Sequence, residues 1–335
     1  MRNPVISVCV PSYNRPKELL RLLRTIDSNP DETQIVVCED CAPKRLEVRA
    51  AVEEFKAETH YDVRYIENEV NKGYDWNVRD FITCADGEYI VYCDDDSCFV
   101  AGALDKLISF LKQHPRIGYV LRRTRTLATG NDMRYFPETK FFAPGVETYQ
   151  MLYRKSVIVA GFTFKRELAI EHMTDRFDGT LLYQLYILAE ICLKYPSAYW
   201  DEPLTEKLPS NTEFYFGMSA KEKGLYEPKK VTARNQMNFI RSFLKISRYV
   251  DDKYGLSSTS YIRKDIAKYS YPILEFMMRA SRKEMLKVAW MMKKEGLGDS
   301  VYFYLYILGL FFLGSKNCNK MIVCIKKKLG HTPAL

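Results

Sequence analysis

Residues 89–96 of the chain read Tyr-Ile-Val-Tyr-Cys-Asp-Asp-Asp, an apolar run that ends in three consecutive carboxylates. Adjacent carboxylates repel one another, so this arrangement is costly unless a cation or hydrogen-bond donors compensate the charge. Alternate side chains of an extended segment point the same way, so Asp94 and Asp96 can face one ligand together. Oxygen ligands suit Mg²⁺ or Mn²⁺, and Mg²⁺ typically binds through one or two carboxylates and the phosphates of a substrate. The run therefore predicts either a divalent cation site or a solvated acidic turn.

Around this run, apolar segments alternate with amphipathic ones. The expected strands are residues 5–10, 34–38, 63–66, 89–93 and 117–121, and the expected helices are residues 17–27, 46–58, 76–85 and 103–113. Near-continuous apolar strands separated by amphipathic helices indicate an α/β fold with a Rossmann-like, mostly parallel sheet and helices on both faces. Ligands of such sheets bind at the carboxyl ends of the strands, which directs attention to Pro11–Arg15, Glu39–Asp40 and Asp94–Asp96.

Beyond residue 121 the pattern changes twice. Residues 124–208 have loop and hairpin character through Pro144, then a predicted strand at Val157–Val159 and an apolar helix at residues 180–194. After Pro228 the pattern is helical almost throughout. We therefore expect one α/β unit over residues 1–220 and an all-helical extension over residues 221–335.

Charge divides the 335 residues into an acidic front and a basic back. Residues 221–335 contain 23 Lys and Arg against 9 Asp and Glu, whereas the whole chain carries a formal net charge of +8. This asymmetry predicts a polyanion or an anionic membrane surface as partner. No recognised nucleic-acid-binding module accompanies the positive charge, so we do not expect a nucleic acid. The ordinary hydrophobic content, 47%, excludes a disordered or collagen-like chain.

The longest apolar stretch, residues 301–313, is rich in Tyr and Phe and precedes a cluster of lysines, Lys316, Lys320 and Lys326–Lys328. It is shorter than the ~20 residues that span a bilayer. An aromatic apolar helix beside lysines is typical of a helix lying in the membrane interface, and the alternative is a core helix with a solvated basic end. We expect a cytoplasmic protein, peripheral at the inner face of the plasma membrane.

The nine cysteines agree with a cytoplasmic location, because most sit in apolar runs and suit a reduced, buried set. Cys38 and Cys41 have Cys-x-x-Cys spacing, but no second pair or His cluster accompanies them. A zinc or thioredoxin-like site at this pair is therefore the weaker reading.

Several motifs, in order along residues 4–115, resemble the inverting family-two glycosyltransferases with the GT-A fold, of the bacterial surface-polysaccharide type. Val5 to Arg15 resembles their opening strand, and Ile35 to Asp40 resembles their second strand, which ends in acidic residues. The remaining matches are Asn71-Lys72-Gly73, Asn77, residues 85–90, the D-x-D motif at residues 94–96 and Gly102-Ala103-Leu104.

The resemblance implies a metal-dependent inverting transferase that moves one sugar from a nucleotide-sugar donor to a hydroxyl of a glycan or lipid-linked acceptor. Residues 1–120 would bind the nucleotide sugar, and residues 121–220 would form the acceptor side. The implied site residues are Pro11, Tyr13 and Arg15 around the nucleotide, Asp40 or Glu39 at the base, Lys72 and Asn77 at the ribose or diphosphate, Asp94 and Asp95 at the nucleotide sugar, and Asp96 on Mn²⁺ or Mg²⁺.

The second signature of the family, a Gly-containing loop ahead of an acidic pair, is only partly matched. Tyr183-Gln184 stands where the acidic pair is expected. Asp178 is the nearest carboxylate in the corresponding loop, so the resemblance makes it the predicted general base, with a helix-capping role as the alternative. Further candidates for the base are Asp175, Glu190 and His172. The processive-synthase signature of the family is absent, which indicates transfer of a single sugar.

Two other functions remain open at this point. A nucleotidyltransferase also combines an α/β sheet with a carboxylate-bound metal, but no Gly-rich basic phosphate loop lies near the first strand. A non-catalytic, membrane-peripheral protein that binds nucleotide sugars is favoured by the missing acidic pair.

Overall fold

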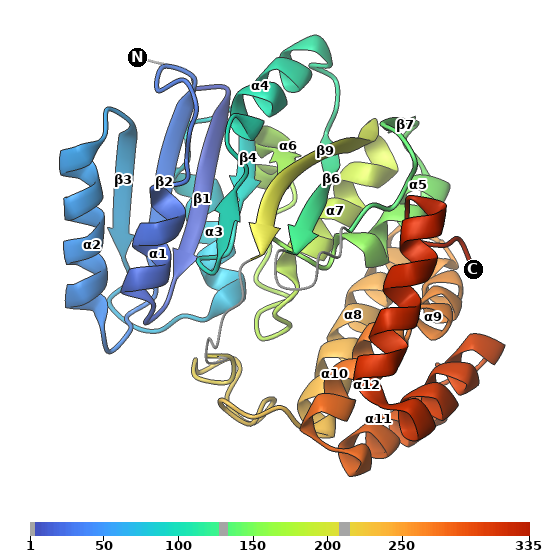
Figure 1. Ribbon diagram of the computed structural model, residues 1–335. Helices are drawn as coiled ribbons and strands as arrows, with labels where there is room; N and C mark the ends of the chain where they lie inside the picture. Colours follow the sequence, from blue (N-terminus) through green and yellow to red (C-terminus); the bar gives the residue numbers. More distant parts are fainter. Residues whose placement is uncertain (1–3, 127–132, 208–214) are drawn as a thin grey trace.

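The computed structural model describes residues 4–126, 133–207 and 215–335, and within them one nine-stranded sheet has the order β3-β2-β1-β4-β8-β6-β9-β5, with β7 paired to β9 (Figure 1). The strands are β1 (Ile6–Ser12), β2 (Thr33–Glu39), β3 (Asp62–Glu67), β4 (Tyr89–Tyr92), β5 (Ser97–Phe99), β6 (Tyr119–Thr126), β7 (Lys140–Phe142), β8 (Phe162–Lys165) and β9 (Ser197–Lys207). The helices are α1 (Pro16–Leu23), α2 (Arg45–Glu58), α3 (Tyr74–Cys84), α4 (Ala103–Gln113), α5 (Val146–Tyr153), α6 (Arg166–Ile170), α7 (Tyr183–Lys194), α8 (Ala233–Tyr254), α9 (Ser258–Lys268), α10 (Tyr271–Ala280), α11 (Arg282–Lys294) and α12 (Val301–Leu329).

The first half of the sheet is parallel, and the second half is mixed. β3, β2, β1 and β4 pair in parallel, so Val8 lies opposite both Ile35 and Val91. β8 starts at the carboxyl end of β4, where Phe162 pairs with Tyr92, and therefore runs antiparallel to it. Among the described strands, four pairings are parallel and four are antiparallel, so the sheet is more mixed than the apolar pattern predicts.

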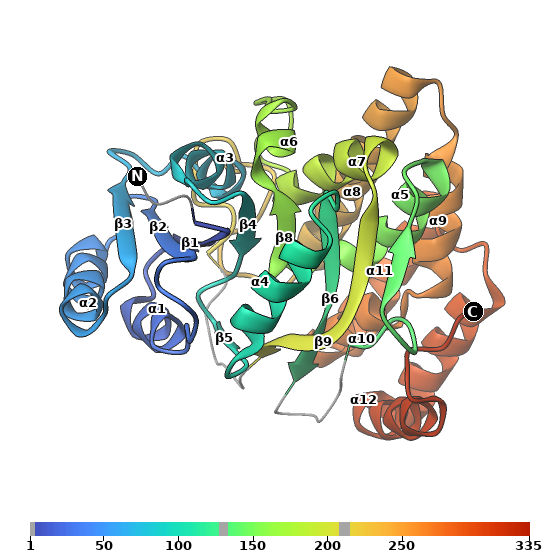
Figure 2. The ribbon, with the colours of Figure 1, turned by 90° about the horizontal axis from the view of Figure 1, so that it is seen from above.

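Helices cover both faces of the sheet, as Figure 2 shows. α1, α2 and α4 pack on one face against alternate strand residues such as Val8 and Ile35. α3 and α7 pack on the other face against the intervening residues, such as Cys9 and Val36. This alternation is the period-2 geometry of strands buried on both sides. The predicted α/β fold is confirmed.

The helical extension shares its hydrophobic core with the sheet unit. Met237 and Phe243 of α8 belong to the same buried cluster as Leu185 and Tyr186 of α7. The Tyr153 hydroxyl donates a hydrogen bond to the Phe243 carbonyl over 2.9 Å. Figure 1 shows α8 to α12, coloured orange to red, gathered at one side of the sheet. The predicted all-helical extension is confirmed for residues 233–329, and it packs on the α/β unit as one body.

One local prediction is wrong. Val157–Val159 is not a strand: a 3-10 turn (Arg154–Ser156) precedes it, and the strand of this region is β8. Short apolar runs without a clear period cannot separate strand from loop, which explains the error. The helix that contains the apolar stretch at residues 301–313, α12, continues beyond it to Leu329 across a kink at Gly314, where φ is 75° and ψ is 166°.

At Gly87, the loop before β4 lies close to the backbone of β1. An alanine Cβ at this position would lie 2.4 Å from the backbone nitrogen of Ser7. We expect Gly87→Ala to lower the free energy of unfolding by about 3 kcal/mol, because backbone must shift to relieve the overlap. Urea unfolding followed by circular dichroism measures this change.

The matched control is Gly102→Ala, where φ is +66° and no atom lies within 4 Å of the added Cβ. Backbone strain alone should cost this variant about 1 kcal/mol. Equal losses for the two variants would contradict the predicted contact at Gly87.

Candidate functional site

A cavity of about 460 Å³ lies at the carboxyl ends of β1, β2 and β4, where the sequence pattern places a ligand site. The lining includes seven of the predicted site residues: Pro11, Tyr13, Arg15, Asp40, Asn77, Asp94 and Asp95. It also includes residues that were not among the predicted site residues: Ser12, Asn71, Gly73, Tyr74, Tyr92, Val157, Val159, Leu181, Leu182, Gln184, Tyr215, Phe216, Glu222 and Phe239. Four predicted residues, Glu39, Lys72, Asp96 and Asp178, are not part of this lining.

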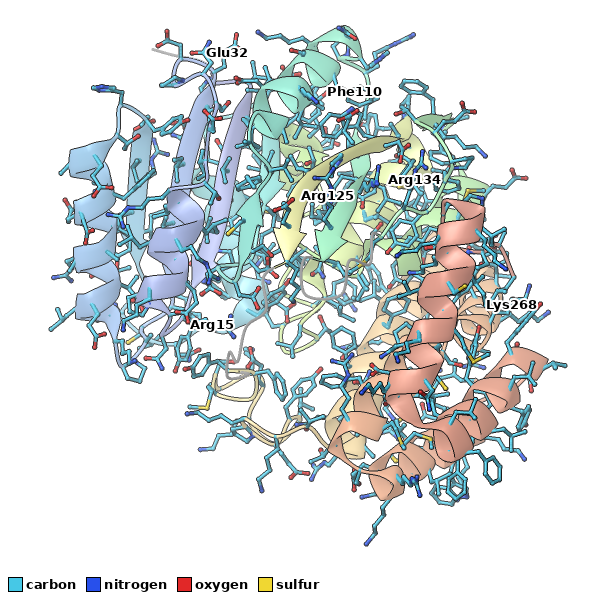
Figure 3. All side chains as sticks on the ribbon, in the orientation of Figure 1. Arg15, Glu32, Phe110, Arg125, Arg134 and Lys268 are labelled. Carbon is cyan, nitrogen blue, oxygen red and sulfur yellow. The ribbon has the colours of Figure 1, made fainter. Side chains whose placement is uncertain are left out.

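The three consecutive carboxylates are held by partners from separate elements. The Ser97 hydroxyl donates to Asp94, and the Arg15 guanidinium lies 2.7 Å from the Asp95 carboxylate. Lys207 Nζ, at the end of β9, lies 3.9 Å from Asp96 Oδ2. Figure 3 shows Arg15 beyond the end of β1, on the side toward which the parallel strands run.

Burial makes negative charge on two of the three carboxylates unfavourable. Burial and, second to it, the neighbouring Asp96 carboxylate raise the pKa of Asp94 to about 6, while Lys207 and the Ser97 hydrogen bond oppose the shift. Burial also raises the pKa of Asp95 to about 7, against the lowering effect of Arg15. Carboxyl groups with raised pKa values are typical of functional sites, and a bound cation would favour their charged form.

The donor chemistry of Asp94 and Asp96 fits a hard divalent cation. Both groups offer oxygen, and they lie close enough that the Asp96 carboxylate helps to raise the pKa of Asp94. In the described ranges no group of three or more His, Cys, Asp or Glu side chains is arranged to hold a metal. Such a cation would therefore take its remaining ligands from water and from the phosphates of a substrate.

Asp40 holds the loop that precedes α3. Its carboxylate accepts hydrogen bonds from the backbone nitrogens of Lys72 and Gly73, each over 2.8 Å, and from Asn68 Nδ2 over 3.1 Å. Burial raises the pKa of Asp40, and these donors oppose the shift. Of the two acidic residues left open after β2, the structure places Asp40 in the cavity wall.

The side chains of Glu39 and Lys72 interact with residues that are close to them in the sequence. The Glu39 carboxylate accepts hydrogen bonds from the backbone nitrogens of Cys41 and Ala42. Lys72 Nζ lies 5.0 Å from the centre of the Trp76 ring and 3.6 Å from the Asp80 carboxylate. Both side chains are therefore occupied with neighbouring residues and do not reach the cavity lining.

Asp178 is paired with Arg79. The guanidinium binds the carboxylate through both nitrogens, and the two side chains are only 9% and 6% exposed. The start of α7 is instead capped by Asp75 of α3, whose carboxylate accepts from the backbone nitrogens of Leu181, Leu182 and Tyr183. The capping alternative for Asp178 is therefore wrong, and its role as base stays a prediction.

Gln184 connects the two halves of the cavity wall. Its Oε1 accepts a hydrogen bond from the Tyr74 hydroxyl over 3.2 Å, which joins α7 to the start of α3. Gln184 occupies one position of the expected acidic pair, so a neutral side chain faces the cavity there. The replacement of an expected acidic residue by Gln184 therefore lies within the site.

The loop that begins at Tyr215 closes the other side of the cavity. The Tyr215 hydroxyl accepts from Asn14 Nδ2 over 3.1 Å, and its ring lies 5.3 Å from the Arg15 guanidinium. Glu222 accepts from the backbone nitrogens of Tyr74 and Gly217 over 3.1 and 2.8 Å. Apart from the local bond to Gly217, these contacts join positions about 150 to 200 residues apart, and no periodicity or local motif in the sequence predicts them.

Within residues 4–126, 133–207 and 215–335, several buried polar atoms of the lining make no hydrogen bond, and two of them are Ser12 Oγ and Asn77 Oδ1. Buried polar groups are normally satisfied, so these atoms are sites for a polar ligand. Together with Arg15, the aromatic rings and the carboxylates, they give the cavity the chemistry to hold an anionic, ring-containing molecule with a cation.

Comparison with known proteins agrees with this geometry. Residues 7–170 match the model of the family described as Glycosyl transferase family 2. A Haemophilus influenzae protein described as an uncharacterized glycosyltransferase is 26% identical over 117 residues, which are 35% of this chain. The match spans only 37% of that relative's length. The family resemblance of residues 4–115 is confirmed.

Solved structures share the fold over most of the chain. TarS 1–349 of S. aureus, in complex with UDP-GlcNAc, superposes with a TM-score of 0.56 at 17% identity, covering 88% of this chain and 78% of that TarS chain. The mannosyltransferase PcManGT of Pyrobaculum calidifontis, in complex with GDP-Man and Mn²⁺, gives a TM-score of 0.51 at 15% identity, covering 94% and 87%. At these identities the likeness establishes the fold.

A variant of Asp178 can distinguish a structural role of this residue, as the partner of Arg79, from a catalytic role. We expect Asp178→Asn to lower the free energy of unfolding by about 3 kcal/mol, because Arg79 would remain buried without a neutralising partner. The exposed pair Lys106–Glu202 provides the control, and Glu202→Gln should change stability by less than about 1 kcal/mol. Unchanged stability of Asp178→Asn in urea, with loss of transfer activity, would instead assign Asp178 as the base.

Proposed function

Residues 7–170 belong to glycosyl transferase family 2, and on this premise we propose that the protein is a metal-dependent inverting glycosyltransferase. It moves one sugar from a nucleotide-sugar donor to a hydroxyl of a glycan or lipid-linked acceptor. The observation that carries this proposal is the placement of Asp94, Asp95 and Arg15 in the lining of a cavity with aromatic walls, at the carboxyl ends of three parallel strands.

We expect the nucleotide-sugar donor to bind on the side of the cavity that is formed by residues at the ends of the first strands and by Tyr215. Tyr13 and Tyr215, whose rings lie 5.5 Å apart, offer faces and edges to a nucleoside. Ser12 and Asn77 offer the buried oxygens that have no partner in the described chain. Arg15 carries positive charge beside the carboxylates and is placed to meet a diphosphate. The complexes of TarS with UDP-GlcNAc and of PcManGT with GDP-Man support a nucleotide-sugar donor.

Asp96, with Asp94, would hold Mn²⁺ or Mg²⁺, and the bound cation would stabilise the negative charge of the departing nucleoside diphosphate. The Mn²⁺ in the PcManGT complex supports this assignment. Arg15 lies beside the same carboxylates and would add a second positive charge next to the diphosphate. The cation and Arg15 would then both stabilise the departing nucleoside diphosphate. Asp95, which pairs with Arg15, keeps the guanidinium in place at the cavity wall.

The acceptor side is formed by the second half of the lining. Val157, Val159, Leu181, Leu182 and Phe239 give this side an apolar surface, beside the Tyr74–Gln184 hydrogen bond. Inversion requires the acceptor hydroxyl to attack the anomeric carbon opposite the diphosphate and to lose its proton. The family resemblance assigns proton removal to Asp178, and the pairing of this carboxylate with Arg79 is the obstacle that such a role must overcome.

The alternatives differ in their products. A nucleotidyltransferase would release pyrophosphate, whereas the proposed transferase releases a nucleoside diphosphate. A non-catalytic binder would release neither, and the neutral Gln184 in the cavity is the observation that favours it. We propose surface-polysaccharide synthesis on the cytoplasmic side of the membrane as the setting of this transferase, and the basic extension and the family resemblance support this proposal.

The decisive experiment incubates the full chain and Mn²⁺ with a panel of nucleotide sugars and candidate acceptors, and identifies the released nucleotide and the product anomer. We expect nucleoside diphosphate and an inverted linkage. Asp96→Ala should lower turnover by at least 10²–10³-fold, because one ligand of the charge-stabilising cation is lost. Asp252→Ala, on the exposed surface of α8, is the matched control and should retain full turnover. Normal turnover of Asp96→Ala would reject the metal assignment.

Metal removal gives an independent check. Treatment with EDTA should abolish turnover, and Mn²⁺ or Mg²⁺ in excess should restore it in the native chain. The Asp96→Ala variant should need a much higher Mn²⁺ concentration for the same rate, measured as the half-saturating concentration. Activity that survives EDTA dialysis would show a transferase that works without a cation.

A further inference from the structure

We propose that α11 and the first half of α12 form a docking surface for an anionic lipid bilayer, and that this surface enters the membrane interface without crossing the membrane. The surface consists of an apolar face (Leu286, Trp290, Val301, Leu305, Leu308 and Phe312) and of lysines around it. It lies apart from the cavity, so the inference does not depend on the proposed reaction.

The apolar face is continuous along one side of α12. Val301, Leu305, Leu308 and Phe312 are spaced by four, three and four residues, which places them on one helical face. Phe312 is 73% exposed and Leu308 is 54% exposed. The opposite side of α12 is buried in the core through Phe303 and Leu310. The exposed apolar side chains therefore face solvent from a helix that is already packed against the protein.

α11 extends the same surface. Arg282 lies over the Phe311 ring at 5.6 Å, and Lys293 lies over the Tyr304 ring at 5.8 Å, so α11 runs beside the first half of α12. Trp290 of α11 is exposed, with the Lys294 ammonium 3.8 Å from its ring centre. Tyr and Trp beside lysines are the side chains that favour the boundary between lipid headgroups and acyl chains.

The positive charge of the lysines around the apolar face indicates that this surface binds an anionic partner. The exposed lysines of this region are Lys283, Lys287, Lys293, Lys294, Lys316, Lys320, Lys327 and Lys328. Lys316, Lys320, Lys327 and Lys328 line one open concavity on the second half of α12. Two nearby acidic groups are already engaged, because Glu284 accepts from the Ala233 backbone nitrogen and Glu295 pairs with Arg241, so the exposed lysines outnumber the remaining acidic group, Asp299. A second copy of this surface would bring like charges together, whereas anionic lipid neutralises them.

The shape of α12 favours an interfacial position over a transmembrane one. Within the described residues α12 is the one helix whose length and composition would allow it to cross a membrane. The kink at Gly314 divides it, and each half is shorter than the ~20 residues that a crossing needs. Lys316, Asn317, Asn319 and Lys320 follow the kink directly, which would place polar groups in the hydrocarbon of a spanning helix.

The test measures co-sedimentation of the full chain with vesicles of phosphatidylcholine and phosphatidylglycerol, and with vesicles of phosphatidylcholine alone. We expect binding to the anionic vesicles that high salt reverses, and little binding to the neutral ones. The variant Lys316→Gln/Lys320→Gln/Lys327→Gln should bind about 100-fold more weakly. The variant Leu308→Ser/Phe312→Ser should bind about tenfold more weakly, because less apolar area enters the interface.

Matched controls carry the same chemical changes on the α/β unit. Leu46→Ser/Val70→Ser removes two apolar side chains that are 69% and 62% exposed, and Lys17→Gln/Lys106→Gln/Lys112→Gln removes three exposed lysines. Both should bind like the native chain, and circular dichroism checks that every variant is folded. Equal binding to neutral vesicles, binding that high salt does not reverse, or equal losses in the controls would overturn the proposal. So would a dimer in sedimentation velocity that only Leu308→Ser/Phe312→Ser disrupts, because the face would then bind a second copy.

Discussion

Three adjacent carboxylates follow β4, of which Asp95 and Asp96 are buried and Asp94 is partly exposed, and each is held by a side chain from a different element. Arg15 comes from the loop after β1, Ser97 from the start of β5 and Lys207 from the end of β9. β5 pairs with β9 so that Ser97 lies opposite Lys207. The raised pKa values of Asp94 and Asp95, which burial causes, show that negative charge on these two carboxylates remains unfavourable. The cation that we propose for this site would offset that cost.

The parallel half of the molecule could be predicted from the sequence because its signals are local. Apolar runs of strand length, amphipathic helices between them and polar residues at the strand ends place Arg15, Asp40 and Asp94 at one edge of the sheet. The choice between Glu39 and Asp40 could not be made, because neighbouring residues at a strand end point in opposite directions. Only the observed backbone hydrogen bonds to each carboxylate decide which one faces the cavity.

The second half of the site could not be predicted, because its contacts join distant parts of the chain. Asp75 caps α7 from more than 100 residues away, and Tyr215 reaches Asn14 across about 200 residues. Transfer of roles by family position also failed to anticipate that Asp178 would be held by Arg79. Sequence periodicity reports which face of an element is buried, but not which distant element covers it.

β9 links the carboxylate cluster to the helical extension. Near its start, Asp201 pairs with Arg134, which also donates to the carbonyl of Gly330 at the end of α12. At its far end, Lys207 stands beside Asp96. Hydrogen bonds from Lys268 and Tyr269 of the α9 region to the last residues fix the same end of α12. One strand therefore connects the anchor of α12 to the cavity, so a bilayer bound by α12 would hold the cavity at a set orientation to the lipid surface.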